Sequence, residues 1–200
     1  MKRIGMLGAL LAGALLAVPA LAQEPGQGYF AFGYGSARTD GASPYTNTQD
    51  DASAGGLRLY GGKLIWDNIG MEVGYYDFGT LDVTFGGAKI AETKTQGVTI
   101  SGIFVVPLGG GFNLRGRGGI LFSQARFTCV SQCGVGTPVN ANTKQTDVSG
   151  TLGAGVSARL GKDVEIRLDY DHFGNVKHSV SGTTYNDSYD TVSLALQFNF

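Results

Sequence analysis

The last nine residues, 192–200, read VSLALQFNF and alternate without a break between apolar and small or polar side chains. Since the side chains of a strand point alternately to its two faces, this period of two places five apolar side chains on one face. They are Val192, Leu194, Leu196, Phe198 and Phe200. Such a strand is typical of the lipid-facing wall of a membrane barrel. The terminal strand of a soluble sheet could alternate in the same way.

Seven earlier segments alternate similarly, and each is long enough to cross a bilayer as a tilted strand of about 9–11 residues. We expect strands at 28–37, 56–65, 69–78, 97–106, 112–123, 148–160, 164–173 and 190–200. Short turns are expected at 66–68, 107–111 and 161–163, and long polar loops at 38–55, 79–96, 124–147 and 174–189. Short and long connections alternate strictly. This pattern predicts an all-β, eight-stranded antiparallel up-and-down transmembrane β-barrel with short periplasmic turns and four external loops.

Charged side chains gather on the strand face opposite the apolar one. They are Arg58, Glu72, Arg115, Arg117, Arg159, Glu165, Arg167 and Asp169. A soluble barrel would turn these charges to water, whereas a membrane barrel would enclose them, and we favour the membrane arrangement. Because charges withdrawn from water must be paired, we expect a salt-bridged lumen without a wide pore.

The expected partners within the lumen are only partly specified by the sequence. Glu72 would pair with Arg115 or Arg117. Glu165 or Asp169 would pair with Arg159 or Arg167. The alternative is that some of these charges lie near the rims of the barrel and are simply hydrated.

Residues 1–22 have the pattern of a secretory signal peptide. Lys2 and Arg3 precede an apolar stretch at 4–16, and the A-x-A site at 20–22 predicts cleavage before Gln23. Residues 23–200 would then form one barrel domain. The cleaved chain would carry 13 basic and 16 acidic residues, a charge near −3 that gives no reason to expect a nucleic-acid partner.

The remaining composition is informative about the fold and the compartment. The chain has 33 glycines and only 5 prolines, which suits a crowded and sharply curved sheet. Cys129 and Cys133 lie in a polar loop, and for an exported protein we expect a local disulfide between them. A metal site would need further ligands, and no other Cys or His lies nearby. The glycine run at 109–111 lacks the strand-to-helix context of a phosphate loop, so no cofactor is expected.

Three segments resemble the OmpA-like family of eight-stranded outer-membrane barrels, for the barrel domain only. They are GGKLIWDNIGMEVGYYDFGTL at 61–81, VEIRLDYDHFGNV at 164–176, and the ending VSLALQFNF. The ending also resembles the assembly signal of outer-membrane barrels, which implies the barrel assembly machinery as a partner. The resemblance further implies a monomer in the outer membrane, in contact with its lipid and lipopolysaccharide.

The resemblance implies a structural role in envelope integrity, or interactions with host or surface ligands through the external loops, and no enzymatic activity. Two alternatives remain, a small-solute porin and a lipid A deacylase. Barrel deacylases use an H-x-S pattern with an acidic partner, the Ser being the nucleophile and the His its base. The corresponding residues here are His172, Phe173 and Gly174, and glycine has no hydroxyl.

Overall fold

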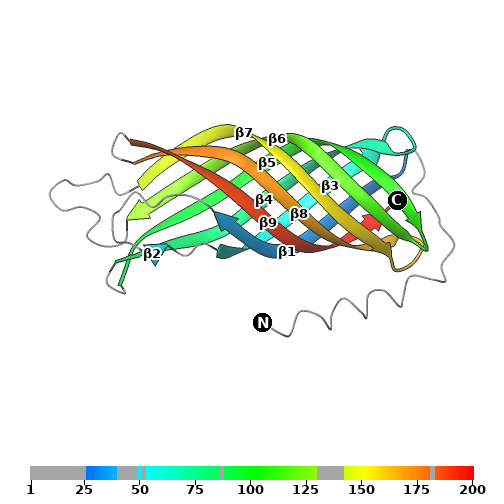
Figure 1. Ribbon diagram of the computed structural model, residues 1–200, viewed down its shortest axis with the longest axis horizontal. Coiled ribbons are helices and arrows are strands. Elements are labelled where there is room, and N and C mark those ends of the chain that lie inside the picture. Colours follow the sequence, from blue (N-terminus) through cyan, green and yellow to red (C-terminus); the bar gives the residue numbers. More distant parts are fainter. Residues whose placement is uncertain (1–25, 40–48, 51–52, 86–87, 130–141, 181–182) are drawn as a thin grey trace.

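The computed structural model describes residues 26–39, 49–50, 53–85, 88–129, 142–180 and 183–200, which form an antiparallel β-barrel (Figure 1). Its strands are β1 (Gly28–Thr39), β2 (Gln49–Asp50), β3 (Ser53–Leu64), β4 (Ile69–Phe85), β5 (Ala88–Gly109), β6 (Phe112–Cys129), β7 (Asn142–Arg159), β8 (Val164–Val180) and β9 (Thr183–Asn199). The predicted signal peptide at 1–22 lies outside the described residues and stays a prediction.

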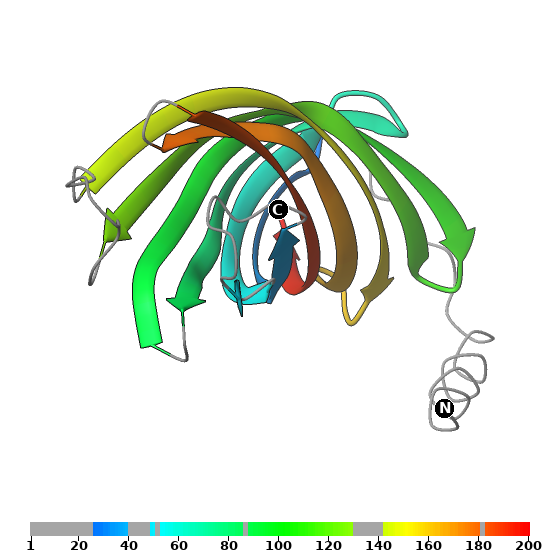
Figure 2. The ribbon, with the colours of Figure 1, turned by 60° about the vertical axis from the view of Figure 1, so that its left-hand side comes forward.

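Eight long strands close the barrel, each hydrogen-bonded to the next along the chain (Figure 2). The first and last long strands, β1 and β9, pair from Tyr29 opposite Asn199 to Thr39 opposite Tyr189. The two-residue β2 only extends the sheet beside β4, where Gln49 lies opposite Thr84. The predicted eight-stranded up-and-down barrel is therefore confirmed. In the described part of the chain, no helix is long and apolar enough to span a membrane.

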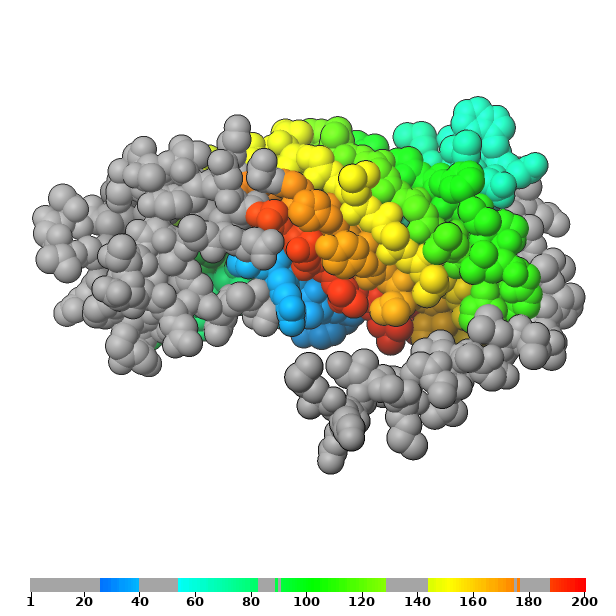
Figure 3. Space-filling view, in the orientation of Figure 1, coloured from blue at the N-terminus to red at the C-terminus, as the bar shows by residue number. Residues whose placement is uncertain are grey.

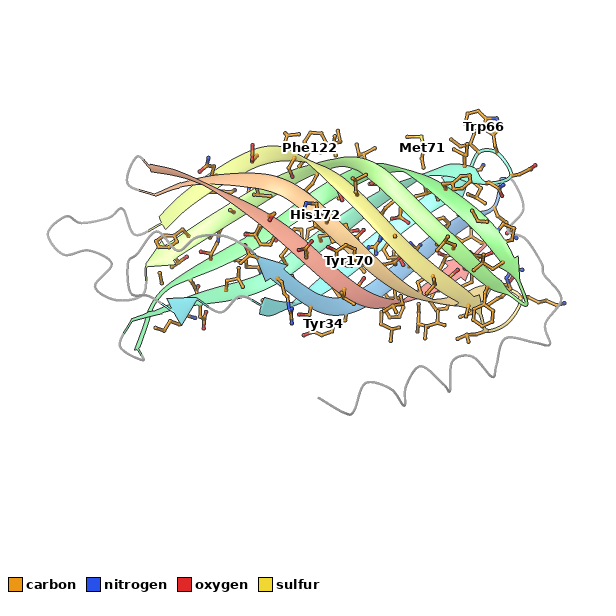
Figure 4. The ribbon with its side chains drawn as sticks, viewed as in Figure 1. Tyr34, Trp66, Met71, Phe122, Tyr170 and His172 are labelled. Carbon is orange, nitrogen blue, oxygen red and sulfur yellow. The ribbon has the colours of Figure 1, made fainter. Side chains whose placement is uncertain are left out.

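The alternation of the sequence separates an apolar outside from a charged inside. The outward residues include Phe30, Val73, Leu152, Leu168 and Leu194, which are 48%, 52%, 67%, 49% and 56% exposed. Figure 4 shows Met71 and Phe122 pointing away from the wall. Since water would expel so continuous an apolar surface, this exterior is built to face lipid. The space-filling view shows one side of this wall, where β1, β9, β8 and β7 lie side by side (Figure 3).

Both chain ends of the barrel and the short turns lie at one end, which we call the periplasmic end (Figure 1). The turn between β5 and β6 is tighter than the predicted 107–111, because β5 continues through Gly109. Gly109, Gly110 and Gly111 all have positive φ, at 89°, 64° and 81°. A side chain at these positions would be strained, so the glycine run permits the reversal.

At the opposite, external end, two predicted loops are strands. β4 continues to Phe85 and β5 begins at Ala88, so most of the expected loop 79–96 is a hydrogen-bonded hairpin. Likewise β8 reaches Val180 and β9 starts at Thr183, within the expected loop 174–189. Both extensions pass a register shift, which lies between Asp77 and Thr80 in β4 and between Phe173 and Val176 in β8. Such bulges interrupt the period of two, although the backbone ladder continues beyond them.

Candidate functional site in the barrel lumen

The centre of the lumen is organised around the carboxylate of Glu72 on β4. Its Oε1 accepts hydrogen bonds from Arg58 Nη2 at 3.1 Å and Arg117 Nη1 at 2.9 Å. Its Oε2 accepts them from Tyr29 Oη at 2.8 Å and Arg167 Nη1 at 3.3 Å. The four donors come from β3, β6, β1 and β8, so one side chain connects strands from all around the barrel.

Two aspartates of β8 complete the central cluster. Asp169 Oδ2 lies 2.9 Å from Arg58 Nη1 and 3.2 Å from Arg167 Nε. Asp171 accepts hydrogen bonds from Arg117, one of them from Nη2 at 2.8 Å. Together with Glu72 these carboxylates balance three buried arginines. Each of these arginines is therefore paired with carboxylates, as buried charges require, although Arg58 Nε and Arg167 Nε have no hydrogen-bond partner among the described residues.

A second, smaller cluster lies toward the periplasmic end, around Glu165. This carboxylate is fully buried and lies 2.9 Å from Arg115 Nη2 and 3.7 Å from Arg159 Nη2. Asn199 Nδ2 donates a further hydrogen bond to it, at 3.4 Å. Only the Arg159 side chain, which is 11% exposed, approaches solvent.

Glycines of β7 make room for the central cluster. Gly153 lies opposite Arg117 of β6 and Asp171 of β8 in the ladder. A Cβ at Gly153 would collide with Asp171 and lie 2.6 Å from Arg117 Nε, and a Cβ at Gly155 would collide with Asp169. These glycines are therefore needed for close approach, since even an alanine methyl occupies the space of the ion pairs.

An aromatic layer fills the lumen on the external side of the charges. Phe173 of β8 packs edge-to-face on Tyr76 and Phe78 of β4, with ring centroids 4.9 and 5.0 Å apart. Phe78 also packs on Tyr189 of β9, at 5.1 Å. Tyr76 Oη donates a 3.3 Å hydrogen bond to Asp171, which joins this layer to the charges. All four rings are at most 4% exposed, so the layer closes the external side with apolar surface.

A third layer lies on the periplasmic side, where buried Tyr29, Tyr60, Leu64, Ile103 and Val105 pack together. The guanidinium of Arg58 stacks 4.0 Å above the Tyr60 ring, and that of Arg167 lies 4.4 Å from it. Two small cavities border the charged cluster, of about 10 Å³ beside Arg115 and about 20 Å³ beside Arg58. Each has room for about one water molecule.

A family model for the OmpA-like transmembrane domain matches residues 24–200. The chain belongs to this family. The match covers the whole of the described barrel. Comparison with curated protein sequences finds no match.

Solved outer-membrane barrels share the fold of this OmpA-like chain. Neisserial surface protein A superposes with a TM-score of 0.63 at 16% identity, covering 88% of this chain and 99% of its own. OprG from Pseudomonas aeruginosa gives 0.62 at 15% identity, covering 90% and 98%. Ail, the attachment invasion locus protein of Yersinia pestis, gives 0.55 at 16% identity, covering 88% and 100%. The predicted location in the cell outer membrane is thereby confirmed.

In this OmpA-like barrel all eight charged residues predicted for the lumen lie on the inner face, seven of them buried and Arg159 partly buried. Their ion pairs include some of the predicted alternatives and add contacts that the sequence did not predict, such as those of Arg58 and Arg167 with Glu72. Glu72 contacts Arg117, whereas Arg115 contacts Glu165. Asp169 contacts Arg167, as one of the predicted alternatives, and also Arg58.

The lumen charge network predicted from the sequence did not include Asp171, and the sequence did not lead us to predict that an aromatic layer fills the lumen beside the charges. Asp171, Phe173 and Phe78 all share the inward parity of the strands that carry them, so continued alternation could have found them. Val176 follows the register shift in β8, so the period of two could not have placed it. Tyr29 carries no charge, and only the geometry shows that its hydroxyl contacts Glu72.

Of the deacylase-like positions, His172 lies on the outer face of the OmpA-like barrel (Figure 4), whereas Phe173 is buried in the lumen. His172 Nδ1 lies 2.8 Å from Asp190 Oδ1, which also accepts a 2.7 Å hydrogen bond from Tyr170 Oη. The His172 side chain is 47% exposed, and Gly174 follows it without a hydroxyl. The site therefore holds a histidine and an aspartate on neighbouring strands. At the position where the deacylase pattern has its nucleophilic Ser, this chain has Gly174, which carries no reactive group.

The terminal segment closes the barrel at the periplasmic end. Phe200 N donates to Gly28 O at 2.9 Å, and Gly28 N donates to Phe200 O at 3.0 Å. Val192, Leu194, Phe198 and Phe200 are exposed on the outside, and Leu196 is half-buried there. Their role as an assembly signal stays a prediction. So does the disulfide, because Cys129 is the last residue of β6 and Cys133 lies outside the described residues.

Proposed function

We propose that this barrel is a non-conducting structural protein of the outer membrane, which supports envelope integrity and offers its external hairpins and loops for surface interactions. The observation that carries the proposal is the filling of the lumen by three layers, apolar, charged and aromatic. Moving a solute through it would require breaking several buried ion pairs, and separating one such pair costs about 3–5 kcal/mol. A solute route through the lumen is therefore disfavoured, and we expect the function to reside on the outer surface of the barrel and in its external hairpins and loops.

Conductance in planar bilayers tests the closed lumen. The purified full chain, inserted at a known protein-to-lipid ratio, is expected to give no steady channel, whereas a general porin inserted in parallel gives stable openings. Steady large openings of the full chain would support the small-solute porin instead.

The external β4–β5 hairpin permits a test of the surface role. Leu81 and Thr93 lie opposite each other in the ladder, so residues 82–92 can be replaced by an Asn-Gly turn without changing the register below. Cells that carry this shortened barrel are expected to lose binding to host cells or surface ligands while resisting detergent as the wild type does. Unchanged binding would limit the role to envelope integrity, or move the interaction to another loop.

Lipid A deacylation is the second candidate, favoured by the pairing of His172 with Asp190 at the outer wall. We infer that it does not occur, because no hydroxyl stands at position 174. Incubation of the purified protein with lipid A, followed by mass spectrometry, is expected to give no 3-O-deacylated product. Product that forms with the wild type and disappears in His172→Asn would identify an enzyme.

A further inference from the structure

Three cations lie side by side on the outer wall near the external end. In the ladders of β5, β6 and β7, Lys94 lies opposite Arg126, and Arg126 lies opposite Lys144. All three side chains are exposed and belong to the outward face of their strands. Directly opposed residues of neighbouring strands have Cβ atoms about 4.5–5.5 Å apart, so the row places three positive charges within about 10 Å. We call Lys94, Arg126 and Lys144 the basic row.

This arrangement is unfavourable for the barrel alone. Like charges directly opposite each other destabilise a sheet. Lys94 has one carboxylate partner, Asp77 at 3.2 Å. Within the part of the chain that the structure describes, Arg126 and Lys144 form no ion pair. Two of the three charges of the basic row, those of Arg126 and Lys144, are therefore presented to the surroundings without a carboxylate partner among the described residues.

The rows of residues below the basic row follow the order of the parts of an amphiphilic lipid, from apolar tail to polar headgroup. Four positions toward the membrane, Val98, Phe122 and Val148 form an apolar row on the same three strands and in the same register. They are 42%, 42% and 56% exposed. The uncharged row of Gln96, Gln124 and Thr146 lies between the two. Toward the outside, the wall therefore changes from apolar to polar to cationic.

The spacing of the rows matches the layers of a membrane leaflet. Four residues of a strand span about 13 Å, which a tilt of about 40° reduces to about 10 Å along the membrane normal. The headgroup region on each side of a bilayer is about 5–8 Å thick. With the apolar row a few ångström inside the hydrocarbon, the basic row lies within the headgroup region, where the phosphates are. The external end faces the outer leaflet.

We propose that the basic row binds the phosphate groups of a phosphorylated outer-leaflet lipid, whose acyl chains lie against the apolar row. Arg126 supplies the planar guanidinium that fits two phosphate oxygens, and the lysines on either side act as point charges. The bound phosphate relieves the repulsion within the row. This site lies outside the barrel, so it does not depend on whether the lumen conducts.

Binding of diphosphoryl lipid A to the full chain tests the site, with native mass spectrometry in a neutral detergent as the readout. Arg126→Gln/Lys144→Gln is expected to weaken binding about 25-fold, since each cation near an anionic surface contributes about a factor of five. Lys63→Gln/Lys162→Gln removes two exposed cations from the periplasmic end and is the matched control, with unchanged binding expected. Dephosphorylated lipid A is expected to bind the wild type and the Arg126/Lys144 variant equally.

Stability measurements separate binding from misfolding. Without lipid A, Arg126→Gln/Lys144→Gln is expected to unfold at the same temperature as the wild type or higher, because repulsion is removed. Adding lipid A is expected to stabilise the wild type more than the variant. Independently of any variant, added salt is expected to weaken binding of the phosphorylated lipid and not of the dephosphorylated one.

Three results would overturn the proposal. They are equal binding of diphosphoryl lipid A by the wild type and the Arg126/Lys144 variant, equal binding of phosphorylated and dephosphorylated lipid A by the wild type, and salt-independent binding of the phosphorylated lipid. Inositol hexakisphosphate carries phosphates without acyl chains. If it binds the wild type as tightly as lipid A, the ligand is a soluble polyanion and the lipid proposal is wrong.

Discussion

Arg58 Nη1 of β3 donates a 2.9 Å hydrogen bond to Asp169 Oδ2 of β8, across the lumen and 111 positions along the chain. Both residues are 2% exposed. The same arginine contacts Glu72 of β4, so three strands that are not all neighbours in the sheet share one guanidinium. The charges thus brace the barrel internally, in addition to the hydrogen bonds that run around its wall.

Glu72→Gln is expected to destabilise the barrel by about 3 kcal/mol or more, because it leaves the buried guanidiniums of Arg58, Arg117 and Arg167 short of one negative charge. Urea unfolding in lipid vesicles measures the change. Glu92→Gln, which breaks an exposed pair with Lys89, is the control and is expected to cost under about 1 kcal/mol. Equal effects of the two substitutions would contradict a braced lumen.

Gly155→Ala is expected to destabilise the barrel by about 1–3 kcal/mol, since its Cβ must displace the Asp169 carboxylate. Gly116→Ala is the matched control, because a Cβ there meets no atom within 4 Å, and a change within about 0.5 kcal/mol is expected. Retention of the folded, fast-migrating band on gels of unboiled samples, at increasing temperature, ranks the variants. A Gly155→Ala variant as heat-resistant as the wild type would show that the lumen repacks freely.

Leu168→Arg tests the direction in which the wall faces. Leu168 is 49% exposed in the middle of the outward face of β8, so an arginine there would meet hydrocarbon and is expected to cost about 2–4 kcal/mol. Leu160→Arg, at the periplasmic end of β7, is expected to cost at most about 1 kcal/mol. Urea unfolding in vesicles compares them. Were both substitutions neutral, the outward face would be exposed to water.

Single cysteines test the orientation of the barrel. Asp82→Cys on the β4–β5 hairpin is expected to react with a membrane-impermeant maleimide on intact cells. Lys162→Cys, in the turn before β8, is expected to react only after the cells are permeabilised. The unsubstituted chain gives the background from Cys129 and Cys133. The reverse labelling pattern would place the short turns outside.

The polarity of the residues alone predicted the external ends of the strands poorly. The segment from Thr80 to Phe85 follows Gly79 and lies within the expected loop 79–96, yet it is paired with β5 through Leu81 opposite Thr93 and Val83 opposite Ala91. A hydrated strand and a hydrated loop have similar compositions, because both face water with their side chains. Their difference lies in backbone hydrogen bonds to a partner strand, which the local sequence does not encode. The hairpin that the surface test shortens was therefore found only in the structure.

Up to the register shifts, the sequence by itself determined which side of the wall a strand residue occupies, because the period of two follows from strand geometry and requires no knowledge of neighbours. Arg58, Glu72 and Asp169 were assigned to the lumen in this way. Only the tertiary structure decided which of these charges meet, and that the rings of Phe78 and Phe173 cap them. The physical reason is that contacts across the lumen depend on the tilt and stagger with which the strands close, a property of the whole barrel.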